Sequence, residues 1–176
     1  QSVDFNLNGS VLIKGLKIKP EHENGYDDTI FKAETVYARF GIGGILIFRP
    51  KLKKITVKDF VLDAQQDVQT GRWNLASLSI HPPSGYSGKI PLIRLKRGTL
   101  QYSKVSKDTP VVSLSVPVDA QLGPAEKGED GHRFNVMTGR FANFAPSKLS
   151  GTWKSGNITL SGGLSSADGP EFEKAW

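Results

Sequence analysis

The sequence contains no cysteine and a single methionine among its 176 residues. Without cysteine the chain has no disulfide bonds, no thiol nucleophile and no thiolate-bound metal. Long hydrophobic runs are also absent. The longest, residues 42–48, contains two glycines and falls well short of the roughly 20 apolar residues that a membrane-spanning helix needs. The chain starts without methionine or an apolar leader, so we expect one β-rich module, residues 1–176, that is a fragment of a longer protein.

Residues that carry chemistry are few. The three histidines, His22, His81 and His132, are each expected in a polar loop at the surface, and they show no metal-ligand spacing. The glycines of residues 40–44 lack the lysine of a phosphate-binding loop. The acidic residues 21–28 do not match the spacing of an EF-hand. We therefore predict a protein that is not an enzyme, with no catalytic residue, no metal and no cofactor.

The net charge of +6 makes anionic partners plausible, among them phospholipid head groups, nucleic acid and acidic glycans. The basic residues are spread thinly apart from clusters at residues 51–54 and 94–97, a distribution that also suits an ordinary solvated surface. No zinc-finger, helix-turn-helix or RNP-like pattern is present, so we predict no binding to nucleic acid.

A short pattern recurs three times, at residues 11–18, 55–62 and, more loosely, 93–102. In the first two copies apolar residues occupy positions 1, 3, 6 and 8, and lysine follows at position 4. Each apolar pair has the period of a strand, but the two pairs are out of phase by one residue. A strand keeps one apolar face through such a change only with a bulge or bend. The pattern therefore predicts bent strands with one apolar face.

Other strands have the same one-sided character. Residues 112–122 alternate apolar and polar side chains throughout, and Pro117 within them indicates a sheet edge or an irregularity. Residues 149–162 predict a hairpin that turns at Ser155-Gly156, with Trp153 opposite Ile158 on the apolar face. Residues 30–40 and 134–136 predict further strands. Short helices are expected only near residues 41–48, 73–78 and 170–176, and loops at 20–28, 81–88 and 123–131.

Residues 28–78 carry a family resemblance. The strand-like stretch Asp28–Phe40 precedes a short apolar segment, then the second copy of the bent pattern, then the turn Thr70-Gly71-Arg72-Trp73-Asn74-Leu75. This order resembles the AsmA-like family of bacterial envelope proteins, relatives of TamB. The resemblance covers most of the first half of the chain. The second half resembles the family only in its general character.

The resemblance implies a mainly β fold, a long twisted antiparallel sheet curled into a groove, with one or two short helices. It implies a non-enzymatic module that is periplasmic and inner-membrane anchored in the full-length protein, holding phospholipid or other acyl chains for transfer between membranes. Envelope proteins are further partners. The residues expected to face the groove are Val11, Ile13, Leu16, Ile18, Ile55, Val57, Phe60, Leu62, Leu114, Val116, Val118, Trp153, Ile158 and Leu160.

The same apolar stripes also fit a different architecture. Strands with one apolar face build every closed β-sandwich, where these side chains pack on one another and bind nothing. Such a domain would serve as an envelope scaffold or protein-interaction module. The sequence leaves both interpretations open.

Overall fold

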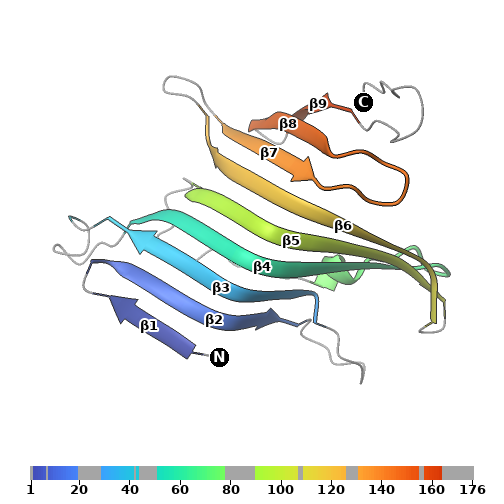
Figure 1. Ribbon diagram of the computed structural model, residues 1–176, viewed down its shortest axis with the longest axis horizontal. Coiled ribbons are helices and arrows are strands. Elements are labelled where there is room, and N and C mark those ends of the chain that lie inside the picture. The colour runs from blue at the N-terminus through green and yellow to red at the C-terminus, as the bar shows by residue number, and fades with distance from the viewer. Residues whose placement is uncertain are drawn as a thin grey trace.

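The computed structural model describes residues 2–6, 8–19, 29–41, 43, 51–77, 90–106, 109–125, 131–154 and 157–163. These residues form one sheet of nine strands whose spatial order follows the sequence (Figure 1). The strands are β1 Ser2–Asn6, β2 Ser10–Ile18, β3 Phe31–Phe40, β4 Leu52–Asp67, β5 Leu92–Ser106, β6 Thr109–Pro124, β7 His132–Thr138, β8 Ser147–Lys154 and β9 Asn157–Gly162. A single 3-10 turn, η1 (Asn74–Ser77), lies between β4 and β5. The mainly β fold is confirmed.

The sheet is mixed rather than wholly antiparallel. Every neighbouring pair runs antiparallel except β4 and β5, which are parallel. Two parallel neighbours need a connection that brings the chain back to the end of the sheet where the first strand began. This connection starts after β4 with a turn that Asp67 holds in place. The Asp67 carboxylate accepts hydrogen bonds from the backbone N–H groups of Gln69 (2.8 Å) and Thr70 (2.7 Å).

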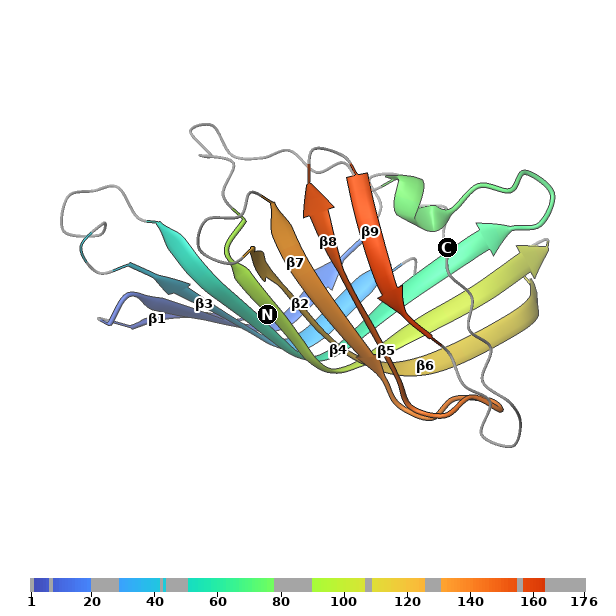
Figure 2. The same cartoon turned by 90° about the horizontal axis from the view of Figure 1, so that it is seen from above.

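The sheet is bent across the middle of its strands, as the repeated pattern predicts. The fifth residue of each copy has a left-handed backbone: Gly15 at φ 68°, Asp59 at 54° and Arg97 at 52°. Asp59 and Arg97 lie level in the register of β4 and β5. Figure 2 shows the result: the central strands descend to a bend and rise again, which gives the sheet the shape of a trough. The left-handed residue restores the phase of the apolar side chains beyond it.

The core lies on one face of the sheet. Ala33, Val36, Val57 and Phe60 form its buried cluster, and partly buried neighbours from β2, β5 and β6 pack against it. The rings of Phe31 and Phe60 stack with their centroids 5.9 Å apart. The bend brings these side chains together without a second layer of secondary structure in the described part of the chain.

Two local expectations are confirmed with detail. Pro117 lies in β6 where β7 ends, since the last β6–β7 pair is Val118 with Thr138. The Pro117 carbonyl accepts a hydrogen bond from the Gly139 N–H (2.8 Å). The Pro117 nitrogen, which has no hydrogen to donate, faces the same way, toward the end of β7. The missing donor therefore costs no hydrogen bond to β5. The hairpin β8–β9 pairs Trp153 with Ile158. The turn at residues 155–156 itself lies outside the described residues.

The expected helix near residues 73–78 is the 3-10 turn η1. Several expected elements lie outside the described residues: most of the helix at 41–48, and all of the helix at 170–176 and of the loops at 20–28 and 81–88. The expected loop at 123–131 is shorter at its start, because β6 continues to Pro124. The prediction that His132 lies in a loop was wrong, because His132 is the first residue of β7. The centroid of its ring lies 5.7 Å from that of the Trp153 ring.

Candidate functional site

The register of the sheet defines two faces of opposite character. On the inner face, which we define as the face that carries Val57 and its cross-strand partners, two rows of apolar residues cross all nine strands without interruption. The first row is Phe5, Val11, Ala38, Ile55, Ile93, Leu122, Phe134, Gly151 and Leu160. The second row is Val3, Ile13, Val36, Val57, Leu95, Ala120, Val136, Leu149 and Gly162.

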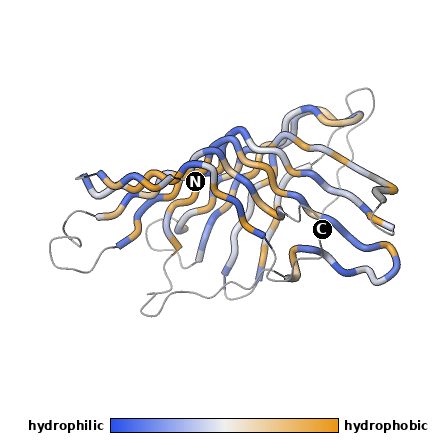
Figure 3. Tube along the Cα trace, turned by 90° about the horizontal axis from the view of Figure 1, so that it is seen from below, coloured by the Kyte–Doolittle hydropathy of each residue, from blue (hydrophilic) through white to orange (hydrophobic). Residues whose placement is uncertain are grey.

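The inner face lies on the open side of the trough. Tyr102 shares this face, since it pairs with Leu114. The Trp73 ring packs against Tyr102 with centroids 5.6 Å apart, which places the turn that leads into η1 over the inner face. Figure 2 shows η1 on the open side of the sheet. Along the strands, hydrophobic and hydrophilic residues alternate, as Figure 3 shows, because successive side chains point to opposite faces.

All fourteen residues expected to face a groove lie on this one face, by register. Three of them, Val57, Phe60 and Val116, are buried. Ile18, Trp153, Ile158 and Leu160 are exposed, and the remaining residues of the set are half-buried. The bend explains why Leu16 and Phe60 belong with Ile13 and Val57 despite the change of phase.

Sequence reasoning missed about half of the face. The omitted residues include Phe5, Phe31, Val36, Leu95 and Phe134. A signal was present for some of them, because residues 93–102 repeat the bent pattern and residues 31–38 alternate with the same phase change. Nothing in the sequence of β1 marked it as a strand, since five residues carry too little periodicity.

The apolar rows end at strands with free edges. In β1, Phe5 is 78% exposed and Val3 is 52% exposed, and in β9 Leu160 is 42% exposed. Among the described strands, β1 and β9 each have a neighbour on one side only. The apolar surface therefore continues from the buried centre to both margins of the sheet.

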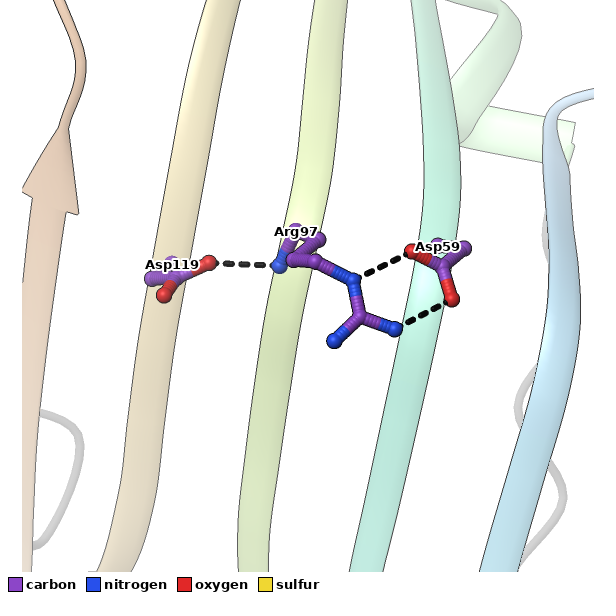
Figure 4. A network of polar contacts seen from close by, with 3 residues as sticks. All are labelled: Asp59, Arg97 and Asp119. Atoms are coloured by element: carbon purple, nitrogen blue, oxygen red, sulfur yellow. Dashed lines mark hydrogen bonds and ion pairs between the residues drawn. The ribbon is translucent and has the colours of Figure 1, made fainter.

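The outer face is polar and carries an ion-pair network at the bend (Figure 4). The Arg97 guanidinium donates two 2.6 Å hydrogen bonds to the Asp59 carboxylate. The Arg97 backbone N–H donates to Asp119 Oδ1 (2.6 Å), where β5 has one residue more than β6. The hydrogen bonds and charge of Arg97 lower the pKa of Asp59. This network joins three adjacent strands at the bend, and two of its residues, Asp59 and Arg97, have a left-handed backbone.

The described residues show little else of the kind that performs chemistry. No group of three or more His, Asp and Glu side chains in this part of the chain is placed to hold a metal ion. None of the described segments forms a helix long and apolar enough to cross a bilayer.

Comparison with known proteins gives no relatives: no protein-family model, no curated protein and no solved structure matches this chain. The site must therefore be interpreted from its own geometry.

Proposed function

We propose that the inner face of the sheet binds acyl chains and that the protein is a non-enzymatic lipid-binding or lipid-transfer module. The observation that carries the proposal is the pair of apolar rows that cross all nine strands and reach exposed residues at both margins, among them Val3, Phe5 and Leu160. Folded soluble proteins rarely leave a large contiguous apolar surface open to water, and such surfaces mark interaction sites.

An acyl chain suits this surface better than a compact polar ligand does. The rows are long and apolar and run along the trough, and they offer few fixed polar groups to orient a substrate. Each methylene removed from water contributes about 0.8 kcal/mol, so an extended chain gains affinity along the whole surface without specific contacts. Polar head groups would remain in water at the margins.

The resemblance to AsmA-like proteins supports a location for this activity. We propose that the module works in the periplasm as part of an inner-membrane anchored protein, and that its cargo is phospholipid or another acyl lipid moving between the two membranes. The bent strands and the one-sided sheet are what such a conduit requires. The family assignment is a proposal that rests on the order of residues 28–78.

Native mass spectrometry of the purified protein tests this function. We expect bound phospholipid in the wild type and less of it in Ile158→Asp, which places a charge on the exposed inner face. The matched control is Thr159→Asp, one residue along β9 on the opposite face, which should retain the lipid. A wild-type protein that binds no lipid, even after incubation with vesicles, would overturn the proposal and leave a protein partner as the cover of this face.

A further inference from the structure

The outer face contains a hollow beside the bulge of β5. Its volume is about 350 Å³, and β5, β6, β7 and β8 form its walls. Its lining combines the apolar residues Leu95, Ala120 and Met137 with charged and amide residues: Arg94, Lys96, Asp119, Gln121, Asn135 and Lys148. Three of these residues are cations and one is a carboxylate, so the hollow has a net positive charge.

Existing contacts leave the lysines available. Arg94 Nε donates to Gln121 Oε1 (3.2 Å), which fixes the guanidinium and the amide against each other. The Asp119 carboxylate already accepts the Arg97 N–H (2.6 Å), which offsets part of its charge. Among the described residues, neither Lys96 nor Lys148 has an ion-pair or hydrogen-bond partner.

The outer face places like charges next to each other on several neighbouring strands. Cross-strand pairing sets Lys17 opposite Lys32, Arg39 opposite Lys54, and Lys58 beside Lys96. Like charges on directly paired residues destabilise a sheet. An anion on this face would relieve that repulsion, and the excess of cations would raise its local concentration.

We propose that this hollow is a binding site for a phosphate-bearing anion, with Lys96 and Lys148 as its charged ligands and the Asn135 amide as a hydrogen-bond donor. Phosphate fits because its several oxygens accept hydrogen bonds from separate donors at once. The site lies on the opposite face from the proposed acyl-chain surface, so the two proposals stand or fall separately. The anion is either a lipid head group at a membrane surface or a soluble phosphate compound.

NMR titration tests the soluble source. Inorganic phosphate and glycerol 3-phosphate are added to the protein at about 150 mM salt, where surface charges are screened beyond about 8 Å. We expect saturable shifts of the Asn135 and Gln121 side-chain amide signals. The double variant Lys96→Ala/Lys148→Ala should weaken binding by about tenfold or more, whereas Lys17→Ala/Lys32→Ala, which removes the same charge from the same face outside the hollow, should change it little.

Vesicle flotation tests the lipid source. Protein is mixed with phosphatidylcholine vesicles that contain or lack phosphatidylglycerol, and the binding that depends on phosphatidylglycerol is compared between the two double variants. Loss in the Lys96/Lys148 variant alone, in either experiment, supports the site and identifies its source. Equal weakening in both variants would show diffuse charge attraction and overturn it, as would the absence of binding to the soluble phosphates and to both kinds of vesicle.

Discussion

The aromatic ring of Phe60 on β4 lies directly over Gly98 on β5. A Cβ atom at position 98 would overlap the Phe60 ring, so only glycine permits this contact. Phe60 is 3% exposed and belongs to the buried cluster, which makes the contact the centre of the core. The same arrangement recurs further along the sheet, where the ring of Phe134 covers Gly151. In a sheet with one layer, a ring laid over a neighbouring glycine takes over part of the packing that a second layer would provide.

Gly98→Ala should destabilise the protein because its methyl group forces the Phe60 ring out of its place. We expect a loss of about 1–3 kcal/mol in the free energy of unfolding, the usual cost of overpacking a core. Urea denaturation followed by circular dichroism measures it. Gly43→Ala is the control, since nothing lies within 4 Å of a Cβ at that position. Equal stability of the two variants would show that the Phe60 ring does not stay over Gly98.

Phe60→Ala leaves a cavity at the same place. We expect a loss of about 3–5 kcal/mol, as for other buried phenylalanines truncated to alanine. Added to Gly98→Ala, it should remove the penalty of the methyl group, because the ring that clashed is gone. A double-mutant cycle by urea denaturation measures this coupling, and strictly additive losses would contradict direct contact.

The bend places a left-handed residue in β2 as well as in β4 and β5. Gly15 has φ 68°, and alanine in that conformation costs roughly 1–2 kcal/mol relative to the right-handed regions. Gly15→Ala should therefore lower the free energy of unfolding by about this amount, and Gly15→Asn by less, because asparagine tolerates the conformation. Thermal unfolding of both variants checks the order, and an equal or larger loss in Gly15→Asn would argue against a bend at this residue.

The Asp59–Arg97 pair makes stability depend on pH in a defined direction. Arg97 lowers the pKa of Asp59 below its ordinary value of 3.8, so the native state binds this proton less readily than the unfolded state. The stabilisation is therefore present above pH 3.8 and is lost as the pH falls through the lower native pKa. Asp67 contributes in the same direction, because hydrogen bonds from Thr70 and Gln69 lower its pKa.

Asp59→Asn isolates this effect, since asparagine keeps the left-handed backbone and removes the charge. We expect the variant to have a lower melting temperature than the wild type at neutral pH, and the gap to close as the pH falls below 3.8. High salt should also narrow the gap, because both side chains are accessible to solvent. A gap that is constant across this range of pH would show that the charge pair contributes nothing.

The repeated pattern predicted the fold because its phase change has a direct structural cause. The left-handed residues at the fifth positions were not predicted individually, since Asp59 and Arg97 are unremarkable in a strand sequence and only Gly15 suggests this conformation. The parallel pairing of β4 and β5 depends on the path of the chain between them, which local periodicity does not encode. The contact of Phe60 with Gly98 follows from that pairing, so the sequence did not predict it either.

The hollow on the outer face was not predicted from the sequence for the same reason. The sequence showed a basic cluster at residues 94–97 but gave no reason to combine it with Lys148. The basic cluster lies on β5 and Lys148 on β8, and both line the same hollow, which extends across β6 and β7. The bulge in β5 opens space beside Asp119. Residues from separate strands converge here through register alone.

The proposed function requires that acyl chains contact the inner face of β9 and not its outer face. Site-specific photo-crosslinking in living cells tests it most directly, with a benzophenone amino acid placed at Ile158 or Leu160 on the inner face of β9, and at Thr159 between them on the outer face. We expect lipid adducts from Ile158 and Leu160 and none from Thr159. Adducts to protein alone from Ile158 and Leu160, or equal lipid labelling from all three positions, would contradict it.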